Sequence, residues 1–99
     1  MTIEQYSNYN DEDLIKIFKV LADPVRLNIL RILSKRESEL GCGEVGELLG
    51  MSKSAVSYHF KTLREAGLTI TRKAGQNKFV RLNHETLEKY SLTNLINNL

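Results

Sequence analysis

Residues 44–67 read EVGELLGMSKSAVSYHFKTLREAG, and this stretch decides the fold. Apolar residues at helical spacing predict a short first helix, which Gly50 ends as a left-handed cap. A second helix is predicted to start at Ser52 or Ser54 and to run to Ala66. Two short helices joined by a tight turn are the sequence form of a helix-turn-helix.

The second of these helices has two distinct faces on a helical wheel. Its apolar face holds Val56, Phe60 and Leu63. Its polar face holds Ser54, Ser57, Tyr58, Lys61 and Glu65. Lys53 comes at the helix N-terminus, where backbone amides favour phosphate. One face therefore anchors the helix, and the other offers hydroxyls, an aromatic ring and a cation that suit the major groove of DNA.

The positive charge of the chain is concentrated after the turn of the helix-turn-helix. The whole chain of 99 residues carries +2, but residues 53–82 hold seven Lys and Arg against one Glu, a net charge of +6. Residues 1–52 and 83–99 carry −3 and −1. Such a concentrated positive field favours a polyanionic partner, with an ordinary solvated surface as the alternative for the segment taken alone.

The segment before residue 44 predicts two further helices. Apolar residues recur at helical spacing over residues 11–22, with acidic residues in the first turn, where the helix dipole favours them. Asp23 followed by Pro24 is an N-cap followed by proline at the first helical position, so a second helix begins there. This helix is apolar on most sides, which predicts that it lies at the centre of the core.

The segment after residue 67 predicts a β-hairpin and a last helix. Residues 68–73 and 78–82 alternate in side-chain character around a turn at 74–77. Asn83 then caps a helix that contains the apolar residues of the tail. Three cations gather towards the hairpin tip, namely Arg72, Lys73 and Lys78. They are placed to neutralise phosphates beside a groove, and the alternative is that lysines here only protect edge strands from aggregation.

Length and composition exclude several classes of protein. Residues 1–10 are polar and unpatterned, which predicts a flexible leader before a single folded domain at 11–99. A domain of this size holds one core but hardly a deep substrate cleft as well. One Cys, two His and no phosphate-cradling glycine loop offer no nucleophile and base for catalysis, so we expect neither an enzyme nor a cofactor. The chain has no signal peptide and no apolar run that could span a bilayer, so we expect a cytoplasmic protein without a membrane partner.

Two segments resemble the ArsR family of bacterial winged-helix transcriptional repressors. They are residues 18–30, with Ala-Asp-Pro-x-Arg-Leu at 22–27, and residues 52–68, with Val-Ser-x-His-Phe at 56–60 and Leu-x-x-Ala-Gly-Leu at 63–68. The resemblance covers roughly residues 11–90. It implies a mainly α fold with a small β-hairpin, a winged helix-turn-helix, and a sequence-specific DNA-binding repressor that an unidentified effector releases.

The resemblance also implies a homodimer in which two recognition helices enter successive major grooves. It places Ser54, Ser57, Tyr58 and His59 on the DNA-facing helix. With the cations of the helix and hairpin, the expected DNA-binding set is Lys53, Ser54, Ser57, Tyr58, His59, Lys61, Arg72, Lys73 and Lys78. The expected partner is double-stranded DNA that contains an imperfect palindrome, with half-site centres about 34–36 Å apart.

The implied dimer interface is formed by the first and last helices. Its expected residues are Leu14, Phe18, Leu21, Leu87, Leu92, Leu95 and Ile96. These apolar side chains exceed what one small core can hide, which favours a partner surface. The alternative is that they all pack inside the monomer.

Three further functional possibilities concern metals, oxidants and protein partners. The family's thiophilic Cys-x-Cys site is missing, because Glu39-Leu40 is followed by glycine, Cys42 and glycine, and the tail has a single histidine, His84. No metal site is therefore expected. Cys42 alone leaves a metal- or redox-responsive repressor as an alternative to an inert small side chain. A winged helix that binds another protein instead of DNA is the alternative of a different class, although protein interfaces tend to lack the lysines present here.

Overall fold

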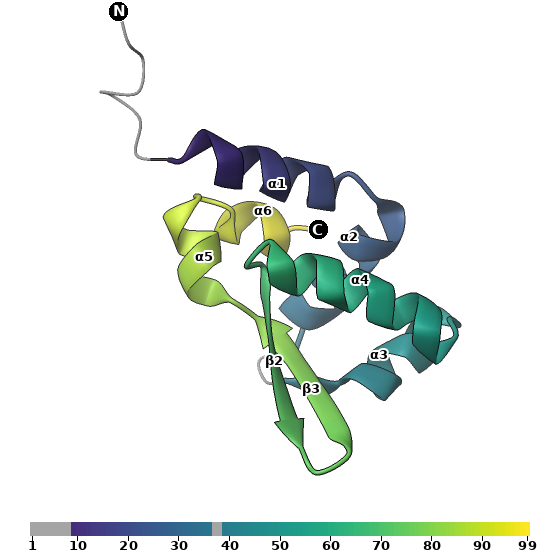
Figure 1. Cartoon of the computed structure of the whole chain (residues 1–99). Helices are drawn as coiled ribbons and strands as arrows, with labels where there is room; N and C mark the ends of the chain where they lie inside the picture. The colour runs from purple at the N-terminus through teal and green to yellow at the C-terminus, as the bar shows by residue number, and fades with distance from the viewer. Residues whose placement is uncertain (1–8, 37–38) are drawn as a thin grey trace, which may run out of the picture.

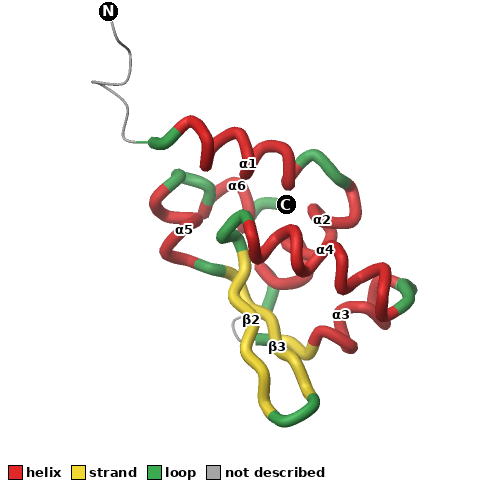
Figure 2. Tube along the Cα trace, viewed as in Figure 1, coloured by secondary structure: helices red, strands yellow, loops and turns green. Residues whose placement is uncertain are grey.

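The computed structural model describes residues 9–36 and 39–99. In chain order the elements are α1 (Asp11–Leu21), α2 (Pro24–Ser34), β1 (Leu40–Gly41), α3 (Cys42–Leu49), α4 (Lys53–Glu65), β2 (Thr69–Ala74), β3 (Asn77–Leu82), α5 (His84–Lys89) and α6 (Thr93–Asn97). The helices gather into one body, and the β2–β3 hairpin projects from it as a wing (Figure 1). Helix and strand are separated by colour in Figure 2. The predicted winged helix-turn-helix is confirmed.

The first two helices both begin at side-chain caps, of which the sequence predicts only Asp23. The side chain of Asn10 accepts hydrogen bonds from the backbone N–H groups of Glu12 and Asp13, which starts α1. Asp23 does the same for the second and third residues of α2, with Pro24 at the first position. Ile29 and Leu30 of α2 are completely buried. Because α2 contacts α1, α3, α4, α6 and β3, it forms the centre of the core as predicted.

The helix-turn-helix of α3 and α4 follows its sequence signals closely. Gly50 ends α3 in the left-handed conformation, with φ of 64°, and Ser52 caps α4 through the N–H of Ala55. A Cβ atom at Gly46 would lie 3.2 Å from Val56 Cγ1, so the glycine lets the two helices pack closely. α3 begins at Cys42 rather than at residue 44, because Gly41 serves as its N-cap.

The wing is part of a three-stranded antiparallel sheet in the order β1-β3-β2. Thr69 pairs with Leu82 at its base and Ala74 with Asn77 at its tip, so the predicted hairpin is confirmed. The third strand was not predicted from the sequence. It consists of Leu40 and Gly41, which pair with Val80 and Phe79 and connect the start of α3 to the wing.

The C-terminal segment differs from the single helix that the sequence predicts. Asn83 caps α5 as expected, but the helix ends at Lys89 and α6 starts at Thr93. The break lies at Ser91, which has a positive φ of 58°. A left-handed residue stops a helix, and it turns α6 back against α2.

Two residues that precede the predicted domain boundary at residue 11, Tyr9 and Asn10, are described in the structure. Residues 1–8 of the predicted leader lie outside the described residues. The ring of Tyr9 stacks on Tyr90 with centroids 5.4 Å apart, and Asn10 caps α1, so both contact the domain. No helix in residues 9–36 and 39–99 is both long and apolar enough to cross a bilayer.

Candidate nucleic-acid interface

The second helix of the helix-turn-helix, α4, is anchored by one face and leaves the opposite face exposed. Val56, Phe60 and Leu63 are buried to between 0 and 4% exposure. All five residues of the predicted polar face are exposed: Ser54, Ser57, Tyr58, Lys61 and Glu65. Tyr58 is 64% exposed, the most of the large hydrophobic side chains in the described residues. α4 therefore presents hydroxyl, phenol and ammonium groups on a rigid, well-packed support.

His59 lies between these two faces and is half-buried. Its Nδ1 is 3.3 Å from Nη1 of Arg26, at the start of α2. The Tyr58 ring meets the His59 ring edge to face, with centroids 5.3 Å apart. Asp23 is close to the same guanidinium, and the hydrogen bond from the backbone N–H of Arg26 lowers the pKa of the Asp23 carboxyl. The His59 ring is thus contacted by Arg26 of α2 and by Tyr58, the residue of α4 that precedes it.

The N-terminus of α4 faces the wing tip across a cleft of about 560 Å³. Lys53, the first residue of α4, is exposed and lines this cleft together with Ser57. Asn77 and Lys78 line it from the wing. The helix N-terminus and the two ammonium groups favour phosphate oxygens, whereas the carboxylates of Glu44 and Glu47, which line the same cleft, oppose them.

Two lysines stand directly opposite each other on the wing. Lys73 on β2 pairs with Lys78 on β3 in the antiparallel register, and both side chains are exposed. Like charges at directly opposed positions destabilise a sheet. A polyanion bound at this point would remove the repulsion, which favours a binding role over a purely structural one.

Arg72 occupies the other face of the wing, because successive residues of a strand point to opposite sides. Its guanidinium forms a salt bridge with Glu39, with Nε 3.0 and 3.2 Å from the two carboxylate oxygens, and it lies 4.8 Å from the centroid of the Phe79 ring. This salt bridge lowers the pKa of Glu39 and raises that of Arg72. The prediction that three cations converge at the tip is therefore wrong for Arg72, which connects the wing to the segment before β1.

The comparisons with known proteins agree with this geometry. Residues 21–72 match the model of a helix-turn-helix domain family. An uncharacterised HTH-type transcriptional regulator of Bacillus subtilis, YceK, is 49% identical over 90 residues, which is 91% of this chain and 87% of that protein. An arsenical resistance operon repressor of Staphylococcus xylosus is 40% identical over 77 residues, 78% of this chain and 72% of that protein.

A solved structure extends the likeness to the whole fold. It is the homodimeric winged helix-turn-helix DNA-binding domain of a possible ArsR-family regulator from Mycobacterium bovis, with a TM-score of 0.73 and 25% identity. The match covers 86% of this chain and 75% of that one. This chain belongs to the ArsR family. It is a DNA-binding transcriptional regulator with a winged helix-turn-helix fold, in which α3 and α4 form the helix-turn-helix and β2–β3 form the wing.

Away from α4 and the wing, this ArsR-family regulator exposes apolar side chains on α1 and α6. Phe18 is 57% exposed and Leu95 is 53% exposed, and both were predicted at a dimer interface. Ile15, which is 54% exposed, was not predicted. Leu14 and Leu21 are half-buried.

The prediction of a dimer interface is wrong for three other residues of the tail. Leu87, Leu92 and Ile96 are between 0 and 8% exposed, and all three belong to the core of the monomer. The break at Ser91 is the reason, because it turns α6 inwards and packs the apolar side of the tail against α2. The alternative of internal packing thus holds for these three residues and fails for Phe18 and Leu95.

Cys42 begins α3 on the wall of the cleft opposite Lys53. It is half-buried and has a free thiol, and burial raises the pKa of that thiol. A raised pKa keeps the sulfur protonated and weakens it as a nucleophile or metal ligand. Within residues 9–36 and 39–99, no three side chains of the His, Cys, Asp or Glu type gather closely enough to hold a metal ion.

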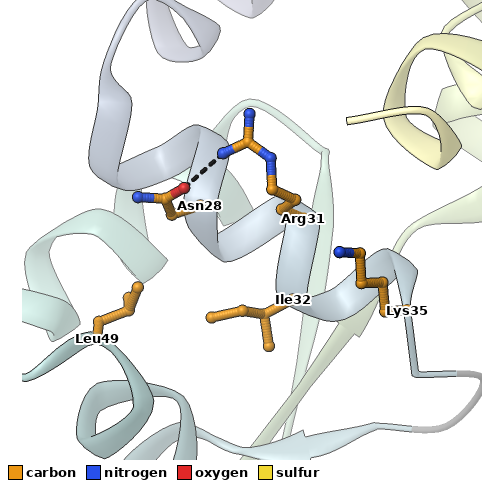
Figure 3. Close-up of a pocket in the computed structure, with 5 residues that line it drawn as sticks. All are labelled: Asn28, Arg31, Ile32, Lys35 and Leu49. Carbon is orange, nitrogen blue, oxygen red and sulfur yellow. Dashed lines mark hydrogen bonds between the residues drawn. The ribbon is translucent and has the colours of Figure 1, made fainter.

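A second, smaller depression of about 150 Å³ lies between α2 and α3. Figure 3 shows its lining residues Asn28, Arg31, Ile32, Lys35 and Leu49. Arg31 donates to the side chain of Asn28 and, at 2.8 Å, to the carbonyl oxygen of Leu99. The guanidinium thus holds the end of the described chain against α2.

Two residues of the ArsR-family site could not be found by reasoning from the sequence. Arg26 contacts His59 across 33 positions of sequence, and Glu39 contacts Arg72 across the same separation. Successive residues of a strand point to opposite faces, so the sequence could have indicated that Arg72 lies on the other face of the wing from Lys73.

Proposed function

We propose that this ArsR-family regulator is a homodimeric repressor that binds an imperfect palindrome in duplex DNA. The observation that carries the proposal is the exposed polar face of α4, which stands on a buried apolar face beside the opposed lysines of the wing. Side chains near the start of a recognition helix reach base edges in the major groove. Such a protein works in the cytoplasm, where bacterial DNA lies.

We assign the reading of bases to the polar face of α4, with Ser54, Ser57 and Tyr58 as its residues. These side chains combine hydrogen-bonding groups with an aromatic edge, as contacts to base edges require. Phosphate contacts fall to four exposed lysines, Lys53, Lys61, Lys73 and Lys78, of which Lys53 and Lys78 line the cleft. Arg72 contributes by fixing the wing, because its charge is already paired with Glu39.

A second copy of the chain would bury the exposed apolar side chains of α1 and α6 in a dimer interface. Ile15, Phe18 and Leu95 are each more than half exposed, and large apolar patches on soluble proteins mark interaction sites. The solved relative from Mycobacterium bovis is homodimeric. Two-fold symmetry would put the recognition helices one turn of duplex apart, about 34–36 Å, and the operator would share that symmetry.

Repression is the mode of regulation that we propose, because the Staphylococcus xylosus relative is an operon repressor. A dimer on a palindrome that overlaps a promoter excludes other proteins from the same DNA.

Tyr58→Ala and Lys78→Ala separate base reading from phosphate binding. Selection of DNA from a random pool, followed by titration of the selected duplex, measures both. We expect Lys78→Ala to weaken binding to all sequences alike, because phosphates carry no sequence information. Tyr58→Ala should relax or change the preference at one or two base positions in each half-site, by about 1–3 kcal/mol of discrimination.

Lys35→Ala is the matched control, since Lys35 is an exposed lysine at the end of α2, outside the cleft. It should keep both wild-type affinity and wild-type preference. If Tyr58→Ala retained the full sequence preference, the outer face of α4 would not read bases and the assignment would be wrong.

A further inference from the structure

Arg26 connects three helices through one side chain, whose exposure is 13%. Its Nε donates a hydrogen bond of 2.7 Å to the carbonyl oxygen of Val20, in the last turn of α1. That carbonyl is one of those for which a helix end offers no partner within the helix. The Nη1 atom lies 3.3 Å from Nδ1 of His59 on α4, and Nη2 lies 4.0 Å from Asp23. α2 passes behind α4 in Figure 1, and the two helices are in contact.

The contact between Arg26 and His59 determines where the imidazole proton is. A guanidinium has five N–H donors, no acceptor, and a charge that it keeps in proteins. A hydrogen bond to Nδ1 therefore requires an unprotonated Nδ1 with its lone pair towards Arg26. The neutral ring then carries its proton on Nε2, because each tautomer has one N–H.

The resulting Nε2–H group is available at the recognition surface. His59 is half-buried and lies next to Tyr58, the most exposed aromatic residue of α4. Among the described residues the one hydrogen bond to the His59 ring is at Nδ1, and Nε2 is not among the buried polar atoms that lack a partner. The edge-to-face contact with Tyr58 restricts the ring further. A single oriented donor remains, without a positive charge.

We propose that Arg26 is a positioning residue that holds His59 as the neutral Nε2–H tautomer, and that this N–H donates to a phosphate oxygen of the bound duplex. The second half of the proposal rests on the proposed function, whereas the tautomer is a property of the protein alone. Arg26 thereby links the end of α1, which carries the exposed Phe18, to a contact on the DNA-binding helix.

A neutral donor leaves a different thermodynamic signature from a lysine. A lysine that neutralises a phosphate releases a counterion, so it contributes to the salt dependence of binding. A neutral N–H releases none. His59 should therefore add affinity equally at every salt concentration, and Lys61 should add affinity that fades as salt rises.

The tautomer is measured by long-range proton–nitrogen correlation NMR on the full chain without DNA, at a pH where histidine is neutral. We expect His59 to show one protonated nitrogen, Nε2, and one lone-pair nitrogen, Nδ1. His84, which is exposed at the first position of α5, is an internal control and should show the averaged signals of exchanging tautomers. An Nδ1–H tautomer at His59, or a mixture like that of His84, would overturn the proposal.

Variants at Arg26 test whether this residue is the cause. Arg26→Met keeps the length of the side chain without donors, and His59 should then become a mixture of tautomers. Arg26→Lys keeps a group that only donates, so it should restore the Nε2–H form. A His59 spectrum unchanged in Arg26→Met would show that another contact fixes the ring. If Arg26→Met fails to fold, the wild-type and Arg26→Lys spectra still decide the tautomer.

Variants at His59 test the phosphate contact by titration of a selected duplex at several salt concentrations. The amide nitrogen of glutamine falls near Nε2 of histidine, and that of asparagine near Nδ1. We expect His59→Asn to lose roughly tenfold or more in affinity at every salt concentration, and His59→Gln to stay within about threefold of wild type. Lys61→Ala should instead make the salt slope shallower by about 0.9 per phosphate lost.

Equal losses in the two His59 variants, or a shallower salt slope in either, would contradict a neutral Nε2–H donor. Circular dichroism and thermal melting of both variants show whether α4 is intact. A wild-type protein that bound no duplex would defeat the proposed function and the phosphate contact together. In that case the NMR result would still confirm or reject the tautomer by itself.

Discussion

We expect Phe18→Glu to convert the proposed dimer into monomers and to lower operator affinity by a factor on the order of a hundred or more. Phe18 is 57% exposed on α1, one helical turn from the similarly exposed Ile15, and Leu95 on α6 is 53% exposed. Burial of an unpaired carboxylate in an apolar interface costs several kcal/mol, and two-fold symmetry introduces the charge twice. A monomer contacts only one half-site. Sedimentation velocity gives the oligomeric state, and fluorescence anisotropy with a labelled duplex gives the affinity.

Leu48→Glu is the matched control for this experiment. Leu48 is 56% exposed, as much as Phe18, but it lies on α3 rather than on α1. The variant should sediment as a dimer. A dimeric Phe18→Glu protein would contradict the proposed interface, and a monomeric Leu48→Glu protein would move that interface to α3.

Leu63→Ala lowers the free energy of unfolding by about 3 kcal/mol, within a range of about 2–5. Leu63 is fully buried on the inner face of α4, so its removal leaves a cavity between the recognition helix and the core. A domain of this size has a total stability of about 5–15 kcal/mol, and the change is a large part of it. Urea unfolding followed by circular dichroism measures the difference.

The control for this loss is Leu48→Ala, which removes the same atoms from an exposed position. Substitutions at such positions usually change stability by less than about 0.5 kcal/mol. If Leu63→Ala destabilised the domain no more than Leu48→Ala, α4 would not be anchored by its apolar face. The presentation of its polar face to DNA would then lose its physical basis.

The parts of the fold that follow local rules could be predicted from the sequence. Asp23 and Pro24 start α2, Gly50 ends α3, and Ser52 starts α4, because each of these signals acts within a few residues of its own position. The two faces of α4 follow from helical periodicity alone. The burial of Val56, Phe60 and Leu63 and the exposure of the opposite face agree with that periodicity.

The parts that depend on contacts between distant residues could not be predicted in the same way. β1 has two residues, Leu40 and Gly41, and it forms because they pair with Val80 and Phe79 of β3, which are distant in the sequence. Apolar residues at helical spacing indicate burial without indicating the partner. For this reason the periodicity of the tail could not separate Leu95, which is exposed, from Ile96, which is buried in the monomer.

The candidate site shows the same division between local and distant information. The exposed residues of α4 and the lysines of the wing are visible in the sequence as a cluster of positive charge. The residues that orient these side chains through distant contacts are not visible in the sequence. Arg26 selects the orientation of His59 and Glu39 holds Arg72, and both contacts arise only when the chain folds.

The salt dependence of operator binding tests the central claim most directly, namely that the cations around α4 and the wing neutralise DNA phosphates. With Lys53, Lys61, Lys73 and Lys78 from each of two protomers, a plot of log affinity against log salt concentration should have a slope of about −7. Lys78→Ala, which removes one contact per protomer, should reduce that slope by roughly 2. A slope near zero, or one that Lys78→Ala leaves unchanged, would contradict the account.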